Sequence, residues 1–217
     1  MKTDTQLKRD VSAELEWDPS IHAAHVGVAV SEGIVTLFGH IETYAEKSAI
    51  ERAVRRVEGV RGLAIELDVK LDPSHVRSDS DIAVAAESML RWNTLIPYEH
   101  IQLKVEKGWV TLTGEVEWSF QRQSAEKAVR MMSGVVGVSN AITLKARTAA
   151  ADISSRIHEA LTRHAAEEAK HIKVTADGGQ VLLQGHVGSW SERSEVIAAA
   201  WAEPGVYSVD CKLAVQP

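Results

Sequence analysis

Hydrophobic residues recur in the same order three times along the 217-residue chain. Each time, apolar residues four apart are followed by two segments in which apolar and polar residues alternate. A second stretch with helical spacing and a last alternating segment complete the unit. Spacing of four is typical of one buried face of a helix, and alternation is typical of a strand that packs on one side. The pattern therefore predicts helix, strand, strand, helix and strand in each unit.

Fixed landmarks indicate that the three units are copies of one another. A histidine and three glycines of the first unit recur at one constant offset in the second unit and at another constant offset in the third. The three sets are His25, Gly33, Gly39 and Gly59; His100, Gly108, Gly114 and Gly134; and His171, Gly179, Gly185 and Gly205. Constant offsets of this kind mark an internal repeat. We therefore expect domains at residues 1–71, 80–146 and 151–217.

The repeated glycines predict three backbone features. Hairpin turns, where positive φ favours glycine, are expected at Gly33, Gly108 and Gly179. A bulge, or a place where another backbone such as that of a helix comes too close for a Cβ, is expected at Gly39, Gly114 and Gly185. The second helix is expected to stop at Gly59, Gly134 and Gly205. In the third unit, Pro204 predicts that this helix ends earlier.

The predicted fold class is α+β. Each unit is expected to form a three-stranded mixed sheet with two helices packed on one face, in the order αββαβ. The first helices should bury the stripes Leu7, Val11 and Leu15; Ile82, Ala86 and Leu90; and Ile153, Ile157 and Leu161. Units of about 70 residues lie near the lower size limit for an independent core, and their linkers are short. We therefore expect the units to contact one another.

The chain resembles a known family in the residues that define the repeat. The residues Gly108, Val110, Leu112, Gly114 and Val116, the helix that follows them, and the Gly-Val pair that opens each third strand resemble the BON (bacterial OsmY and nodulation) domain. The resemblance covers essentially the whole chain as three tandem copies. It implies an αββαβ fold, no known catalytic activity, and a role in binding phospholipid membranes during osmotic or envelope stress.

Composition and charge narrow the classes of protein. With 45% hydrophobic and 25% charged residues the chain has a globular profile, and its net charge of −6 argues against a general nucleic-acid binder. No apolar stretch reaches the roughly 18 residues of a transmembrane helix. The amino-terminal stretch MKTDTQLKRDVSAELEW contains no signal-peptide core, so the expected location is cytoplasmic, or periplasmic if an export signal has been removed.

Motifs for catalysis are not found in the sequence, which lacks a nucleophile elbow, an H-E-x-x-H pair and a phosphate-binding loop. We therefore predict no enzyme activity, no catalytic residue, no metal and no cofactor. The equivalent histidines His25, His100 and His171 could converge on a metal if the units are related by rotation. The favoured interpretation is a strand-start histidine hydrogen-bonded to a neighbouring backbone. Solvated or turn positions are expected for His40 and His186, and partial burial for Cys211.

Aromatic residues supply the candidate binding surface. Trp17 and Trp92 are equivalent and are expected to pack in the core or at a helix end. Trp109 has the parity opposite to Val110, which directs it to the open face of its sheet. Trp118 and Phe120 stand at the start of the second helix of the second unit, where the other units have small residues.

Cations accompany these aromatics in the second unit. Its second helix contains Arg122, Lys127 and Arg130, and residues 80–146 have no net charge, against −3 for residues 1–71 and −2 for residues 147–217. The predicted lipid- or partner-binding site is therefore Trp109, Trp118, Phe120, Arg122, Lys127 and Arg130. The competing interpretation is that the aromatics fill an interface between units and the charges form a solvated face. Two functions follow: a peripheral phospholipid-binding stress protein, or a cytoplasmic scaffold of three docked modules that binds protein and no lipid.

Overall fold

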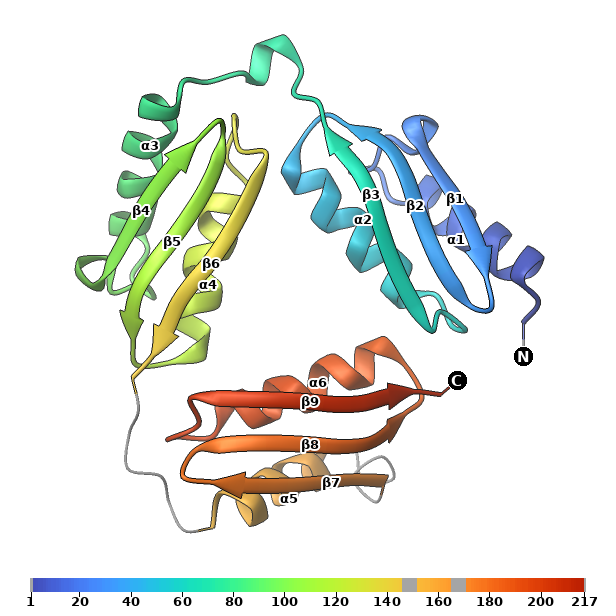
Figure 1. Cartoon of the computed structure of the whole chain (residues 1–217), viewed down its shortest axis with the longest axis vertical. Coiled ribbons are helices and arrows are strands. Elements are labelled where there is room, and N and C mark those ends of the chain that lie inside the picture. The colour runs from blue at the N-terminus through green and yellow to red at the C-terminus, as the bar shows by residue number, and fades with distance from the viewer. Residues whose placement is uncertain (1, 146–151, 165–170, 217) are drawn as a thin grey trace. The chain divides into compact units, whose positions relative to one another are not determined.

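A computed structural model describes residues 2–145, 152–164 and 171–216. The first repeat contains α1 (Asp4–Trp17), β1 (Val26–Ser31), β2 (Ile34–Ile41), α2 (Tyr44–Arg56) and β3 (Gly62–Val69). The second contains α3 (Asp79–Trp92), β4 (Ile101–Glu106), β5 (Trp109–Val116), α4 (Ser119–Arg130) and β6 (Gly137–Leu144). The third contains α5 (Ile153–His164), β7 (Ile172–Asp177), β8 (Gln180–Val187), α6 (Trp190–Ala202) and β9 (Ser208–Val215). This order confirms the predicted αββαβ repeat (Figure 1).

Each repeat forms its own three-stranded sheet, in the orders β1-β2-β3, β4-β5-β6 and β7-β8-β9. In the first repeat β2 pairs antiparallel with β1 and parallel with β3, and Leu37 lies opposite both Val28 and Ile65. Within each repeat the two helices cover one face of the sheet and leave the other face open (Figure 1). The predicted mixed sheet with both helices on one side is therefore confirmed.

Backbone contacts group the chain into two compact units. One comprises Met1–Gly114 with Gln121–Ile142, and the other comprises Glu115–Phe120 with Thr143–Pro217. The core of the third repeat illustrates how a single repeat is held together, because the α5 stripe packs with Val181 and Leu183 of β8 and with Val196 and Ala200 of α6. Truncating such a buried leucine to alanine typically costs about 2–5 kcal/mol.

The glycine at the end of each central strand is required by a close backbone approach. Gly39 has φ +123°, and a Cβ there would overlap the carbonyl oxygen of His25. His25 is the last residue of a short 3-10 turn (Ala23–His25) that leads into β1. The predicted close approach is therefore present, but the neighbouring backbone belongs to this turn and not to an α-helix.

The hairpin turns place two successive residues at positive φ. In the first repeat these are Glu32 (φ +51°) and Gly33 (φ +76°), and the Asp4 carboxylate accepts hydrogen bonds from both backbone N–H groups, at 2.9 and 3.0 Å. In the second repeat Asp79 accepts from Lys107 and Gly108 in the same way, both at 2.8 Å. The third repeat has Gly178 (φ +53°) at the first position. A residue with a Cβ is disfavoured at positive φ, so the carboxylate supports this turn in the first two repeats, whereas glycine adopts it at little cost.

The second helix of the third repeat does not end early. Its last residue, Ala202, is equivalent to Arg56, the last residue of α2, so the helix ends just before Pro204 as predicted but is not shorter than α2. Glu203 occupies the position of Val57, and its N–H bonds to the Ala200 carbonyl. The Glu203 carboxylate lies 3.2 Å from the Arg156 guanidinium of α5, which compensates the charge brought to this largely buried position.

Candidate functional site

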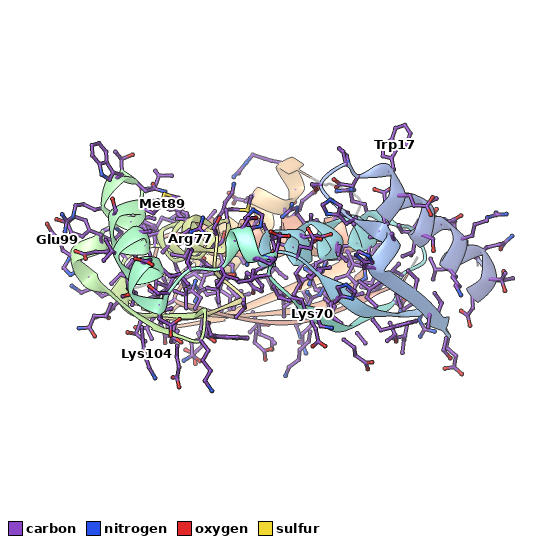
Figure 2. The ribbon with its side chains drawn as sticks, turned by 90° about the horizontal axis from the view of Figure 1, so that it is seen from above. Trp17, Lys70, Arg77, Met89, Glu99 and Lys104 are labelled. Atoms are coloured by element: carbon purple, nitrogen blue, oxygen red, sulfur yellow. The ribbon has the colours of Figure 1, made fainter. Side chains whose placement is uncertain are left out.

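The equivalent tryptophans at the ends of the first helices are exposed. Trp17 is 85% exposed and Trp92 is 84% exposed, so the expectation that they pack in the core or at a helix end is wrong. Each stands two residues beyond the last buried leucine of its stripe, Leu15 or Leu90. Two residues correspond to about 200° around a helix, which turns the indole away from the core. Figure 2 shows Trp17 projecting from its helix into solvent.

The loop after each tryptophan turns back toward the protein. The backbone N–H of Ser20 donates to the Asp18 carboxylate, and that of Leu95 donates to the Asn93 side-chain carbonyl, both at 3.0 Å. Asx turns of this kind reverse the chain directly after a helix. The next residue, Ile21 or Ile96, is buried and anchors the loop. The chain therefore leaves each tryptophan at an outer corner of its repeat.

In the second repeat this corner borders an apolar groove of about 640 Å³. The groove lies between the end of α3, the loop after it and α4; the residues that matter most to its chemistry are Met89, Trp92, Leu95, Lys127, Ala128 and Met131. We call it the α3–α4 groove. Met89, Leu95 and Met131 are exposed, and Met89 lies on the helix side of its repeat in Figure 2, opposite the side reached by Lys104. Four large apolar side chains thus face solvent beside one lysine.

The equivalent positions of the first repeat hold an ion pair. Glu14 and Arg56 occupy the positions of Met89 and Met131, and the Arg56 Nη2 lies 2.8 Å from the Glu14 Oε1. Arg56 also lies 3.7 Å from the Asp18 carboxylate. Trp17 is therefore exposed beside charged groups, whereas Trp92 is exposed beside other apolar side chains.

The predicted cations of α4 occupy different environments. Lys127 lines the groove, and Phe120 is exposed on the same stripe of the helix, two turns earlier. Arg130 pairs with Glu126. Arg122 is partly buried, and this desolvation holds the pKa of its guanidinium below the ordinary value, with Glu126 opposing the shift. Phe120 and Lys127 are thus the predicted residues of this helix that lie along the groove side.

The side chain of Asn140 lies against the inner side of α4. Its Nδ2 donates to the Arg122 carbonyl at 2.9 Å and to the Glu126 carboxylate at 3.1 Å. Trp118, the residue before the helix, is partly buried. The Asn140 hydrogen bonds help to position α4 on its sheet.

Trp109 does not lie with the α4 residues. It is on the open face of the β4–β5–β6 sheet, as predicted, and is 48% exposed. Its ring lies over Gly137, where a Cβ would overlap the indole, and its Nε1–H donates to the Ser139 hydroxyl at 2.9 Å. The helices cover the other face, so the six predicted site residues do not form one surface (Figure 1).

The repeated histidines form pairs across the hairpins. The rings of His25 and His40 stack with centroids 4.6 Å apart, and those of His171 and His186 stack at 4.7 Å. The expectations of a backbone hydrogen bond for His25 and a turn position for His40 missed this pairing. The signal was available, because both residues are equally distant from the two central residues of the hairpin turn, Glu32 and Gly33.

Over residues 2–145, 152–164 and 171–216, no helix is long and apolar enough to cross a membrane. Cys211 is a partly buried thiol packed against the core of the third repeat, as expected.

The geometry defines a protein built of αββαβ modules with an exposed apolar groove on one of them. The chain belongs to the BON domain family, whose pattern matches residues 3–70, 78–146 and 149–217. It is similar to osmotically-inducible protein Y of Escherichia coli (strain K12), with 26% identity over 146 residues, which cover 65% of this chain and 73% of the relative.

Two solved structures show a distant likeness to this chain. The C-terminal domain of CdsD, a structural protein of the type III secretion system of Chlamydia trachomatis, is 15% identical with a TM-score of 0.27, and each chain is covered in full. The periplasmic domain of PrgH is 6% identical with a TM-score of 0.23, and 89% of this chain and 96% of that one are covered. Likenesses of this size carry no argument about function.

Proposed function

We propose that this BON-domain chain is a non-enzymatic protein of the osmotic stress response that binds anionic phospholipid surfaces through the α3–α4 groove. Its similarity to an osmotically-inducible protein supports the physiological setting. The observation that carries the site is the exposed cluster of Met89, Trp92, Leu95 and Met131 next to Lys127.

The apolar cluster supplies a favourable free energy of membrane insertion. Removing a large apolar side chain from water contributes about 1.5–3 kcal/mol, and even partial insertion of several such chains adds up to a few kcal/mol. The indole of Trp92 combines a large apolar ring with one N–H donor, which suits the boundary between acyl chains and headgroups. A shallow insertion at this corner is therefore favourable without a membrane-spanning segment.

Electrostatics favours the second repeat over the other two. Lys127 lies at the groove, and a basic residue near an anionic leaflet contributes about 1 kcal/mol. The segment that contains the groove, residues 80–146, has no net charge, whereas residues 1–71 carry −3 and residues 147–217 carry −2, and both would be repelled by the same surface. The first repeat has the Glu14–Arg56 ion pair, rather than apolar side chains, at the corner of its exposed Trp17 and is the weaker candidate.

Vesicle sedimentation tests the proposal. We expect the full chain to pellet with phosphatidylglycerol vesicles at low salt, more weakly at high salt, and least with phosphatidylcholine vesicles. Trp92→Ala combined with Leu95→Ser should reduce the bound fraction at least several-fold, because both side chains are exposed and make the apolar rim of the groove.

The matched controls are single substitutions at the other exposed tryptophans. Trp17→Ala, at the equivalent corner of the first repeat, and Trp109→Ala, on the open sheet face, should bind nearly as well as the native chain. If Trp109→Ala abolishes binding and the groove variant does not, the membrane site lies on the sheet face and the assignment to the groove fails. If the native chain does not bind anionic vesicles at low salt, the lipid function fails and a protein partner becomes the better explanation of the groove.

A further inference from the structure

We propose that the two histidine pairs, His25 with His40 and His171 with His186, each bind one divalent transition-metal ion. These pairs lie at the open faces of the first and third sheets and are separate from the α3–α4 groove. The proposed ligand is a borderline ion of the Cu²⁺, Ni²⁺ or Zn²⁺ class, because neutral imidazole is a common protein ligand for all three.

The strand register brings the two imidazoles of each pair together. In the first repeat Val26 lies opposite Gly39, which places His25 opposite His40 at the open end of the hairpin. The rings stack with centroids 4.6 Å apart and planes 18° apart. In the third repeat Ile172 lies opposite Gly185, and the rings of His171 and His186 are 4.7 Å apart with planes at 30°. The same pair is thus built twice from the same backbone.

The backbone beneath each pair is held tightly. The carbonyl of His25 packs against Gly39, and that of His171 packs against Gly185, so closely that a Cβ on either glycine would overlap the oxygen. This close contact fixes the positions of the two strands relative to each other at this point. The first histidine of each pair is exposed, and His186 is exposed as well. A fixed backbone with solvent-facing rings is a suitable frame for a surface metal site.

The observed stacking becomes coordination after a small rotation. Two metal–nitrogen bonds of about 2.0–2.1 Å require the two ligating nitrogens to approach within roughly 3 Å of each other. The torsion that turns an imidazole about its Cβ–Cγ bond is broad and costs little for an exposed ring. Directly opposed residues of an antiparallel pair have Cβ atoms about 5 Å apart, which allows both rings to reach one ion.

The remaining coordination positions are left to water. Each proposed site has two protein ligands, and over the described part of the chain no three His, Cys, Asp or Glu side chains are grouped to hold a metal. Such a site favours Cu²⁺, which binds most tightly in the first-row series, over Ni²⁺ and Zn²⁺. In the first repeat Asp68 is the strand neighbour of His40, whereas Ala214 holds this position beside His186. The nearby negative charge of Asp68 attracts a cation without being a ligand, so we expect the first site to be the tighter of the two.

The second repeat provides an internal comparison. His100 is equivalent to His25, but Glu115 takes the place of His40. A carboxylate suits harder ions, so this position should bind Cu²⁺ and Ni²⁺ less well than an imidazole pair.

Calorimetric titration of the untagged full chain with CuCl₂, NiCl₂ and ZnCl₂ at neutral pH tests the proposal. We expect two Cu²⁺ ions per chain, with weaker Ni²⁺ and Zn²⁺ binding. His40→Gln should leave one site, and His40→Gln with His186→Gln should weaken all Cu²⁺ binding by roughly tenfold or more, because one imidazole of each pair is gone. His158→Gln, an exposed histidine of α5 outside the pairs, should retain two sites.

A second set of variants separates metal binding from damage to the fold. His25→Gln with His171→Gln removes the opposite member of each pair and should cause the same loss, with the circular dichroism spectrum unchanged. Native-like Cu²⁺ binding in either double variant overturns the proposal, as does a loss that only one of the two sets shows. Binding of anionic vesicles by these variants should stay at the native level, so this proposal and the proposed membrane function fail independently.

Discussion

The first and second repeats share a backbone and differ in the side chains at one pair of positions. In the first repeat Glu14 and Arg56 form an ion pair between α1 and α2, and in the second the same positions hold Met89 and Met131 beside the α3–α4 groove. Both repeats expose a tryptophan at the same corner. The exposed indole is therefore common to the two repeats, whereas the apolar surface around it belongs to the second.

The third repeat departs from both. It has Ala160 and Ala202 at these positions and Arg163 in place of the tryptophan. A groove of about 420 Å³ lies between α5 and α6, with Glu192 and Glu195 among its lining residues. Small side chains and carboxylates make this groove a poor candidate for an anionic membrane. The equivalent corner therefore has a different set of surface side chains in each of the three repeats.

The largest expected effect comes from giving the second repeat the ion pair of the first. Met89→Glu with Met131→Arg should lower the affinity for anionic vesicles more than tenfold, a loss of about 1.4 kcal/mol or more, because the apolar rim becomes charged. Thermal stability should change little, since both methionines are exposed. Vesicle sedimentation and a thermal melt measure the two quantities. Native-like vesicle binding by this variant would show that Met89 and Met131 do not contribute to membrane binding.

The next effect concerns the hairpin turn that the first two repeats support with a carboxylate. Asp79→Ala should destabilise the second repeat by about 1–2 kcal/mol, because two N–H groups lose a charged acceptor while Lys107 remains at positive φ. Urea unfolding followed through the amide signals of β4 and β5 measures the change.

Copying the third repeat should rescue part of that loss. Lys107→Gly in the Asp79→Ala background is expected to recover about 1 kcal/mol, since glycine adopts positive φ at little cost, as Gly178 does. Failure to recover any stability would mean that the carboxylate does not act through this turn.

A smaller effect is expected from the reverse exchange in the first repeat. Glu14→Met with Arg56→Met should raise vesicle affinity roughly threefold, because Trp17 then has apolar neighbours. The gain is limited by the negative charge of residues 1–71. When these changes are made in the Met89→Glu and Met131→Arg background, vesicle sedimentation measures the contribution of the new apolar surface around Trp17 alone. If the vesicle affinity does not rise in that background, position within the chain matters more than side-chain chemistry.

The smallest effect concerns acid stability of the loop after Trp17. Hydrogen bonds from the Ser20 hydroxyl and backbone N–H hold the pKa of Asp18 below its ordinary value, and Arg56 lowers it further. A carboxyl whose folded pKa is lowered contributes stability above its unfolded pKa of 3.8, and this contribution is lost as the pH falls through the folded pKa. On acidification below about pH 4, the melting temperature of Asp18→Asn, which has the residue found at Asn93, should therefore fall less than that of the native chain. Equal losses in the two proteins would contradict this assignment.

The local pattern of the sequence was sufficient for the fold. Alternation in β2 and the stripe of α1 report which side of each element is buried, and the glycine at position 39 reports a close backbone contact. The partner in that contact was misjudged, because it lies in the short 3-10 turn before β1 rather than on an α-helix. The length of α6 relative to α2 was misjudged as well. The charge of Glu203, at the position of Val57, is compensated by the Arg156 guanidinium, so it does not shorten the helix.

The candidate site was predictable only in part. Lys127, Phe120 and Trp109 were identified as exposed candidates, but Trp109 is on the other face of its sheet from α4. Trp92 was expected to be packed, because a tryptophan at a helix end looks the same in sequence whether or not another element covers it. Met89 and Met131 are distant in the sequence and become neighbours of one groove only when α3 and α4 pack on the same sheet.

Three αββαβ repeats can be predicted from the sequence alone, because helix and strand periodicity and the conformational demands of glycine are local properties. Which side chains meet and which remain in water depends on the tertiary structure. The apolar corner at Trp92 and the stacked pair of His25 and His40 arise from residues that are distant along the chain or on different elements. Their meeting depends on strand register and helix packing, which act over the whole repeat.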